Sequence, residues 1–386
     1  MKFKLILTIL AVIIAVVFFE IALRFFLPEP ENLAKLKSSS VFLHENKPNA
    51  IFHYSSNGEF ENEININSSG FRDDEFSTAK KAGTFRIAVL GDSQEEAMQV
   101  PLIDTWQKVM AKKLSVELKV DVESYNFGVS GYGTDQEWLT LREKVWQFMP
   151  DMIILAFSPN DVGDTYKNKL VRINNGQLDI ISTKEKTGGN WLGNVVRETY
   201  NYHLIAKAFS RNRISKILFD KFRIKILGFP KEERFFLSDA QLVQGPFEVI
   251  ASQKNPPDEV LEGWELVKAL VSDMKKQADS HQAKFLITIN IPRAQVFPDD
   301  WKFLQQRYNL DLTTSAPYEI NVMMGKISND LNILFYDPRL DAIEWTNNYG
   351  ILHYPKDAHF NKNGNLFMGT KVARYILERK LTSKRN

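Results

Sequence analysis

Three residues that lie far apart in the chain have the side-chain types that acyl transfer requires. Ser93 ends the step Gly91-Asp92-Ser93 directly after the apolar run 85–90, and Asp357-Ala358-His359 lies close to the other end of the sequence. A serine hydroxyl becomes a nucleophile only when a base removes its proton, and an imidazole oriented by a carboxylate is suited to that task. The sequence therefore predicts an enzyme with Ser93 as nucleophile, His359 as base and Asp357 as the acid that orients the base.

These residues also have ordinary structural interpretations. Ser93 and Glu96 match the capping box S-x-x-E at the start of a helix, so a structural cap is the alternative to a nucleophile. His353 lies close before His359 and is the other candidate base. Glu95 and Glu96 follow Ser93, and we interpret them as solvated first-turn residues favoured by the helix dipole.

The elements that must position these residues alternate between short apolar runs and helical patterns. We expect strands at 85–90, 120–126, 152–157, 284–291 and 333–336, and helices at about 104–115, 134–147, 258–279 and 364–380. Such alternation is typical of a parallel sheet covered by helices on both faces. The expected fold class is therefore α/β.

Four short blocks follow these elements in order. They are Gly91-Asp92-Ser93 after the first strand, 126–131 after the second, Ser158-Pro159-Asn160-Asp161 after the third, and Asp357-Ala358-His359 before the last helix. In order and placement they resemble the four blocks of the SGNH/GDSL hydrolases, here of a membrane-anchored bacterial type. The resemblance covers about residues 67–161 and 258–380.

The resemblance implies a flavodoxin-like parallel sheet and a defined set of site residues. By position, Ser93, Asp357 and His359 would be catalytic, and the backbone amides of Ser93 and Gly131 with the side chain of Asn160 would form the oxyanion hole. The tetrahedral oxyanion of acyl transfer needs such donors fixed in advance. No metal or cofactor is implied.

Two positions depart from the family pattern. Ser158 stands where the third block usually has glycine, and the last block reads Asp-x-His in place of Asp-x-x-His. On an extended loop, side chains two residues apart point the same way. We therefore expect Asp357 still to reach the imidazole of His359.

The N-terminus contains a segment long enough to cross a membrane. Residues 5–27 are apolar apart from Thr8, Glu20 and Arg24, and as one helix they would be about 34 Å long against a bilayer core of ~30 Å. No small-x-small cleavage site follows this segment, so we favour an uncleaved anchor over a cleaved signal peptide. Lys2 and Lys4 favour a cytoplasmic N-terminus and a periplasmic or extracellular catalytic domain.

The expected organisation is an anchor at 1–27, an irregular stalk at 28–83 and a hydrolase domain at 84–386 with an insertion at about 163–255. Within the stalk, residues 67–72 indicate a structured turn. Within the insertion, residues 207–231 carry eight basic residues against one acid. We interpret them as a cap helix with a solvated basic face, and contact with anionic headgroups or an acidic polysaccharide is the alternative.

Composition narrows the classes of function. The 386 residues are 44% hydrophobic, enough for one large core, and the net charge of +2 is too mild to indicate nucleic-acid binding. With no cysteine, the chain has no disulfide or thiolate site. No spacing typical of metal ligands, dinucleotide binding or a phosphate-binding loop occurs, so no cofactor is expected.

The combined hypothesis is an extracytoplasmic serine hydrolase that cleaves acyl or acetyl esters through an acyl-serine intermediate. Location and family analogy favour an O-acetylated envelope or exported polysaccharide as the substrate. A polysaccharide O-acetyltransferase would use the same residues and is the first alternative. A non-catalytic carbohydrate-binding or assembly factor is the second. The expected partners are the acylated carbohydrate, or another ester, and the membrane that holds the N-terminal helix.

Overall fold

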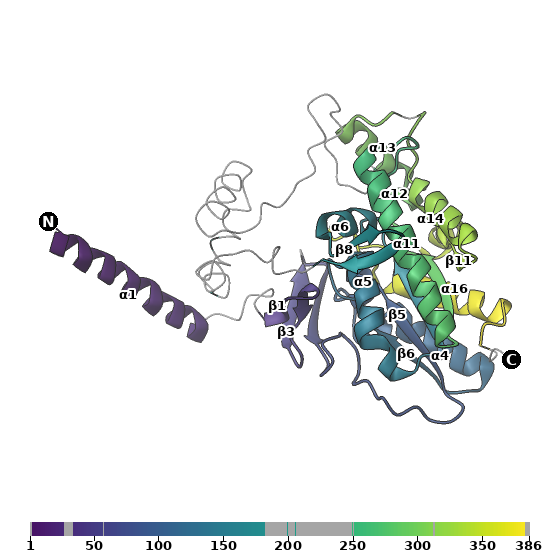
Figure 1. Cartoon of the computed structure of the whole chain (residues 1–386), viewed down its shortest axis with the longest axis horizontal. Helices are drawn as coiled ribbons and strands as arrows, with labels where there is room; N and C mark the ends of the chain where they lie inside the picture. Colours follow the sequence, from purple (N-terminus) through teal and green to yellow (C-terminus); the bar gives the residue numbers. More distant parts are fainter. Residues whose placement is uncertain are drawn as a thin grey trace. The chain divides into compact units, whose positions relative to one another are not determined.

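The computed structural model describes residues 2–26, 34–56, 58–181, 251–311 and 313–382 and the single positions 199, 205 and 249 (Figure 1). The chain divides into two compact units, residues 1–52 with 182–233 and residues 53–181 with 234–386. The central sheet and every residue of the predicted site belong to the second unit.

The central sheet has five parallel strands in the spatial order β11-β10-β7-β5-β6. Their bounds are β5 Phe85–Leu90, β6 Val122–Asn126, β7 Met152–Phe157, β10 Lys284–Ile289 and β11 Leu334–Tyr336. Numbered along the chain, the strand order is 2-1-3-4-5, which is the flavodoxin-like order. The predicted fold class is confirmed by this topology.

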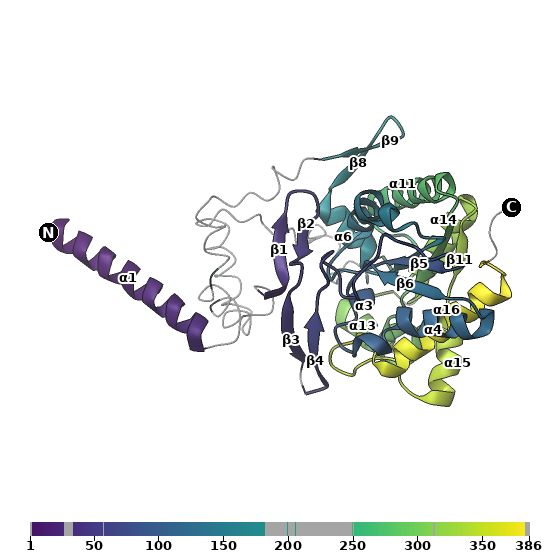
Figure 2. The same cartoon turned by 90° about the horizontal axis from the view of Figure 1, so that it is seen from below.

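Helices cover both faces of the sheet (Figure 2). On one face α4 (Trp106–Leu118) packs against α16 (Lys362–Glu378), and on the other lie α5 (Thr134–Thr140), α11 (Asp258–Ser280) and α14 (Glu319–Asp330). Every residue of β7 is buried, as expected for a strand with helices above and below it. The apolar runs of the sequence are therefore the middle layer of the core.

The other helices are short or lie at the surface. They are α3 Ser93–Glu96, α6 Asp161–Asn168, α12 Arg293–Val296, α13 Pro298–Tyr308, α15 Arg339–Tyr349 and the 3-10 turn Leu102–Asp104. Beyond α5 the helical path continues through a π turn at Leu141–Val145 and a 3-10 turn at Trp146–Phe148. The helix predicted at 134–147 is thus present, although its second half is not α-helical.

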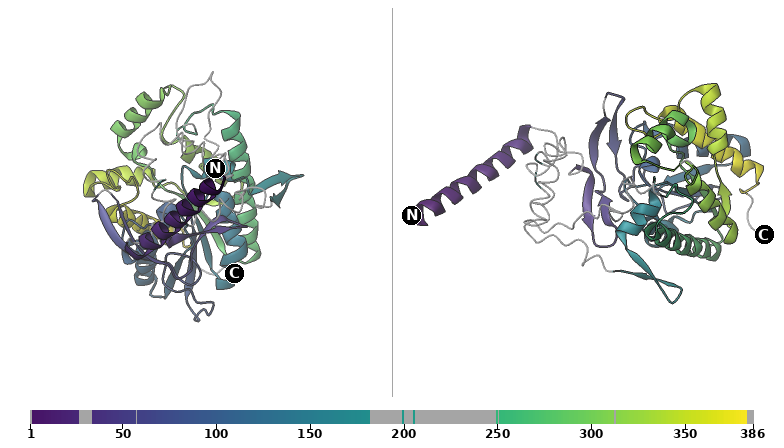
Figure 3. Two further views of the ribbon diagram at one scale, coloured as in Figure 1. Left: turned by 90° about the vertical axis from the view of Figure 1, so that its left-hand side faces the viewer. Right: turned by 90° about the horizontal axis from the view of Figure 1, so that it is seen from above.

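Among the described residues, three hairpins lie outside the central sheet. They pair β1 (Leu36–Ser39) with β2 (Leu43–Asn46), β3 (Ile51–Ser56) with β4 (Phe60–Asn65), and β8 (Val171–Asn174) with β9 (Gln177–Ile180). The first two fall in the segment expected to be irregular, so that expectation is wrong for residues 36–65. The hairpin β8–β9 belongs to the predicted insertion and extends away from the central sheet (Figure 3). The basic segment 207–231 lies outside the described residues.

The N-terminal helix α1 spans Lys2–Phe26. Within it, Ile6–Phe26 is the one helix among the described residues that is long and apolar enough to cross a membrane. The side chains of Glu20 and Arg24 pair at 3.0 Å, which offsets the two charges against each other. A helix of this kind suits either an anchor or a signal sequence.

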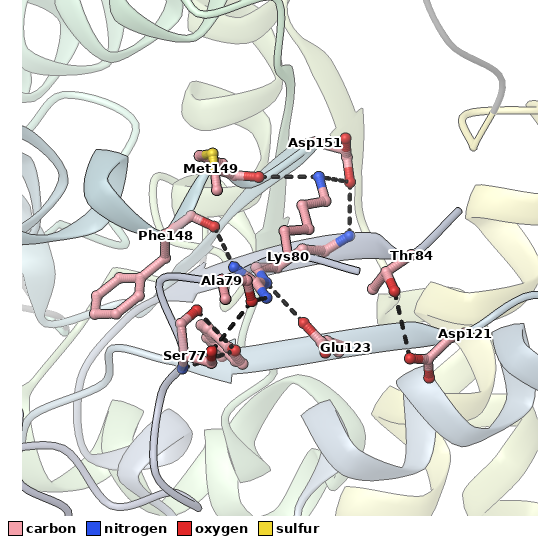
Figure 4. Close-up of polar contacts among 11 residues, drawn as sticks. Ser77, Ala79, Lys80, Thr84, Asp121, Glu123, Phe148, Met149 and Asp151 are labelled. Atoms are coloured by element: carbon pink, nitrogen blue, oxygen red, sulfur yellow. Dashed lines mark hydrogen bonds and ion pairs between the residues drawn. The ribbon is translucent and has the colours of Figure 1, made fainter. Parts of the chain in front are cut away.

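At the amino ends of the sheet strands, Arg86 of β5 binds three other segments, and Figure 4 labels its partners Ala79, Glu123 and Phe148. Its buried guanidinium donates to the carbonyls of Phe148 at 2.6 Å and Ala79 at 3.0 Å and to the carboxylate of Glu123 at 2.7 Å. A cavity of about 760 Å³ lies beside this network, lined in part by Thr84, Asp151, His281, Gln282 and Lys284. Because β5 leads from this edge to Ser93 at its other end, the cavity is separate from the predicted site.

Candidate active site

The turn after β5 places Ser93 as the first residue of α3. The preceding Asp92 is the N-cap, and its side chain accepts the backbone N–H of Gln94 at 2.9 Å. The capping partner is Glu95, whose carboxylate accepts the N–H of Asp92 at 3.1 Å. The helix is therefore capped by Asp92 and Glu95, and the alternative interpretation of Ser93 and Glu96 as the capping box is wrong.

The structure brings Ser93, His359 and Asp357 into one chain of hydrogen bonds. The hydroxyl oxygen of Ser93 lies 2.8 Å from Nε2 of His359, and Nδ1 of that ring lies 2.5 Å from Oδ1 of Asp357. Both serine and histidine are partly exposed, so a substrate can reach them. This is the arrangement in which an imidazole takes a proton from a serine hydroxyl.

A tight turn accounts for the short Asp-x-His spacing. Ala358 has a φ of 68°, in the left-handed region. The turn is closed by hydrogen bonds from the N–H of Tyr354 to the carbonyl of His359 at 2.9 Å and from the N–H of Ala358 to the carbonyl of Tyr354 at 3.1 Å. The expected contact between Asp357 and His359 is present, but the turn that produces it is not an extended loop.

The electrostatics of His359 suit a general base. Burial disfavours the charged ring, but the hydrogen bond and the charge of Asp357, with a further contribution from Asp92, outweigh it and raise the pKa of His359 above 6.5. For Asp357, burial favours the neutral acid, but the hydrogen bond and charge of His359 prevail and lower its pKa. The pair is thus built to stabilise a carboxylate beside an imidazolium.

The other imidazole, His353, cannot serve as the base in this geometry. It is 1% exposed, and its Nε2 lies 2.7 Å from the carbonyl oxygen of Ile291, to which it must donate. Burial, more than any other cause, lowers its pKa to about 4. His353 is therefore a neutral core residue, and the structure places His359 against Ser93.

Glu95 is a buried residue, which corrects the expectation of a solvated side chain. It is 0% exposed and accepts hydrogen bonds from Trp106 Nε1 at 3.1 Å and from the Asn290 amide at 3.1 and 3.2 Å. A Cβ atom at Gly91 or Gly128 would overlap this side chain, which explains the glycines on both sides of it. Burial and then the charge of Asp92 raise the pKa of Glu95 well above 4.5.

Glu96 is likewise buried and holds the loop that follows β6. Its carboxylate accepts hydrogen bonds from the backbone N–H of Ser130, at 2.9 Å, and from the Ser130 hydroxyl. The next residue, Gly131, is exposed and has a φ of 78°, which glycine adopts without strain. The second block is thus fixed beside the turn of Ser93 by an acid that the sequence indicated to be solvated.

Asn160 lies beside the residue that precedes the nucleophile. Its amide nitrogen donates to Asp92 Oδ2 at 3.2 Å and to Asp164 Oδ2 at 2.9 Å. Although Asn160 is the N-cap of α6, its side chain makes no capping bond. At the position where the family has glycine, Ser158 accepts a hydrogen bond from Asn290 at 2.9 Å, so its hydroxyl has a partner inside the protein.

The oxyanion hole predicted from Ser93, Gly131 and Asn160 remains a prediction. As the first residue of α3, Ser93 has a backbone N–H that no carbonyl of its own helix can accept. Asn160 and the loop of Gly131 lie around the same turn, tied to it through Asp92 and Glu96 respectively. The structure therefore gathers the three predicted donors around the Asp92–Glu96 turn.

Two residues that support the site were missed from sequence. Arg72 is 2% exposed and donates to the carbonyls of Glu96, Ala97 and Val100, the main chain that follows the nucleophile. Burial lowers the pKa of Arg72 to about 10.

Asn290 directly follows β10 and donates hydrogen bonds to both Glu95 and Ser158. An asparagine at the carboxyl end of a predicted strand was an available indication for Asn290, whereas nothing marked Arg72 beyond its place in the predicted turn.

Comparison with known proteins gives similarity at the level of structure. No family model matches the chain, and no curated protein sequence matches it. A GDSL-like lipase from Bacteroides thetaiotaomicron is 12% identical over 79% of this chain and 93% of its own, with a TM-score of 0.37. A psychrotrophic esterase from Pseudoalteromonas sp. is 13% identical over 76% and 98%, with a TM-score of 0.38.

An acetyl xylan esterase is 13% identical over 76% of this chain and 100% of its own, with a TM-score of 0.40. At this level of similarity, conclusions about this chain rest on its own strand order and on the geometry around Ser93.

Proposed function

We propose that this protein is a serine acyl hydrolase of the SGNH type that cleaves esters through an acyl-Ser93 intermediate. One observation carries the proposal, the chain of contacts from Ser93 through His359 to Asp357 at 2.8 and 2.5 Å. The flavodoxin-like strand order supports it, because the turn after the first sheet strand presents Ser93 at the carboxyl edge of the sheet, where ligands bind in open α/β sheets.

In the first half-reaction, His359 Nε2 takes the proton of Ser93 while the serine oxygen attacks the ester carbonyl carbon. The backbone amides of Ser93 and Gly131 and the amide of Asn160 would stabilise the oxyanion, once Asn160 turns a donor from its carboxylate partners to the substrate. The imidazolium, stabilised by Asp357, then protonates the leaving alcohol. In the second half-reaction His359 deprotonates a water that attacks the acyl carbon, and the imidazolium then returns the proton to the Ser93 oxygen as the bond to the acyl carbon breaks and the acid leaves.

The proposed substrate is an O-acetylated polysaccharide of the cell envelope or of an exported polymer. Support comes from α1, which has the length and hydropathy of a membrane span, and from the basic N-terminus, which favours a catalytic domain outside the cytoplasm. A site that stands outside the membrane on an anchored chain would meet envelope polymers there.

The test combines covalent labelling with acetate release. A fluorophosphonate should label the wild-type protein at Ser93, and Ser93→Ala should lose labelling and at least about 10³-fold of its ester hydrolysis while staying folded. Acetate release from acetylated glycans, measured with and without an acceptor sugar, separates hydrolysis from transfer to a sugar. Full activity in a folded Ser93→Ala protein would exclude the proposed mechanism.

A further inference from the structure

We infer that Glu59, in the turn of the hairpin β3–β4, is a positioning residue for the catalytic acid Asp357. The inference rests on the proposed function and extends it to a segment that the sequence analysis assigned to a stalk. It makes this hairpin part of the active-site architecture.

The carboxylate of Glu59 binds the main chain of residues 354–359, here called the acid loop. Its two oxygens lie 3.0 and 3.2 Å from the backbone nitrogen of Lys356, and Oε2 also accepts the N–H of Asp357 at 3.0 Å. The two backbone donors lie at and beside the residue whose side chain contacts His359. Charge-assisted hydrogen bonds of this kind are roughly twice as strong as neutral ones.

The hairpin makes further contacts with the rest of its unit, and these contacts fix the position of Glu59. Asn62 in β4 donates to the carbonyl of Met98 at 3.1 Å, and Ile64 is 0% exposed. The ring of Phe60 lies 5.0 Å from that of Tyr354, whose hydroxyl donates to the carbonyl of Gln99 at 3.0 Å. Glu59 therefore links the acid loop to the segment that follows the nucleophile helix.

The acid loop needs such support because its turn is tight. Between Asp357 and His359 stands Ala358 at a φ of 68°, a conformation that costs a residue with a Cβ free energy. Without Glu59, the N–H groups of Lys356 and Asp357 would hydrogen-bond to water, and the conformational freedom of the turn would increase. A displacement of about 1 Å in a catalytic group can cost up to about 10²-fold in rate.

Steady-state kinetics and fluorophosphonate labelling of the full-length protein test the inference. Glu59→Ala should reduce kcat and the labelling rate of Ser93 by about 10-fold with little change in KM, because the acid loop acts on the base and not on the substrate. Glu59→Gln keeps one acceptor oxygen and should recover most of the lost rate. The matched control is Glu63→Ala, an exposed acid on strand β4 of the same hairpin, which should behave as wild type.

A second measurement separates failure of this inference from failure of the proposed function. Hydrogen exchange of the peptide that contains Lys356 and Asp357 should be faster in Glu59→Ala, whether or not Ser93 is catalytic. Wild-type kcat and labelling in Glu59→Ala, with Ser93→Ala inactive, would overturn the role of Glu59 alone. Equal losses in Glu59→Ala, Glu59→Gln and Glu63→Ala would reduce the effect to a loss of hairpin stability and would also overturn it.

Discussion

At the scale of single residues, the site depends on one imidazole with two different neighbours. His359 contacts Ser93 through Nε2 and Asp357 through Nδ1, so the acid selects the tautomer whose free nitrogen faces the hydroxyl. The chain offers a natural comparison in His353, which is buried against the carbonyl of Ile291. Residue type alone does not distinguish the two rings, but their hydrogen-bond partners do.

Removal of the acid should change both the rate and its pH dependence. Asp357→Asn should lower kcat by about 10²–10⁴-fold, with little change in KM. Because Asp357 holds the pKa of His359 above 6.5 and the base acts only when neutral, activity should rise with pH in the wild type. In Asp357→Asn the rising limb of the kcat profile should move to lower pH. If Asp357→Asn keeps the wild-type kcat and the rising limb of its pH profile does not move, His359 acts without Asp357.

The two imidazoles should respond very differently to substitution. His359→Ala and the double variant of Asp357→Asn with His359→Ala should be about equally inactive, since residues that act as one unit are non-additive. His353→Ala should affect stability more than the rate per folded molecule, because His353 is a core residue. Hydrolysis rates normalised to folded protein distinguish these outcomes. Loss of activity with His353 but not with His359 would contradict the assignment of the base.

At the scale of elements, α3, α5 and α6 bury several carboxyl groups near Asp92, the residue before Ser93. Glu95, Glu137 and Asp161 are each no more than 1% exposed, and the pKa of all three is raised well above its usual value by burial first and then by neighbouring acids. Hydrogen bonds from Asn290 and the capping arrangement of Asp92 explain why Glu95 is tolerated there. The elements that assemble the site therefore hold acids that favour their neutral form.

This burial predicts a pH-dependent stability. Below pH 4.5 Glu137 is protonated in the folded and in the unfolded protein. As the pH rises above 4.5, the unfolded chain loses this proton, whereas the folded protein keeps it because its pKa is raised. The folded state is then progressively disfavoured until the pH passes the raised pKa. Glu137→Gln should remove this penalty. The increase in the free energy of unfolding from wild type to Glu137→Gln should therefore be larger at about pH 8 than at about pH 5.

Chemical denaturation at both pH values checks this expectation. The matched control is Glu143→Gln, a largely exposed acid on the turn that continues α5. It should leave the pH dependence unchanged. Parallel curves for the wild type and Glu137→Gln would show that Glu137 titrates alike in both states.

At the scale of the whole molecule, the apolar helix α1 leads to a prediction of the membrane topology. If α1 is uncleaved with its basic end in the cytoplasm, a reporter fused after Asn386 should report an extracytoplasmic location. The protein should also resist alkaline extraction and retain its N-terminal residues, as a helix of this length requires. A soluble product that begins near residue 28 would identify the segment as a cleaved signal.

The sequence by itself determined the sheet and the residue types of the candidate site. The bounds predicted for the strands at 85–90 and 152–157 agree with the structure residue for residue, because strands buried on both faces read as nearly continuous apolar runs, here interrupted only by Arg86. The same apolar pattern did not predict the elements at the surface. The helix α15 buries only Ala342, so its sequence carries almost no apolar period. Similarly, β3 and β4 alternate in burial, but each has a single buried side chain, Phe52 and Ile64 respectively, so the apolar signal in their sequences is weak.

Only the tertiary structure decided how the polar residues around Ser93 are used. Glu95 and Glu96 look like solvated first-turn acids in sequence, but they are buried because Asn290 and Ser130, from distant parts of the chain, supply their hydrogen-bond donors. The role of Glu59 likewise depends on contacts with a loop almost 300 residues away in the chain. A local pattern records hydrophobicity and turn preference, whereas the partner of a buried charge is chosen by three-dimensional proximity.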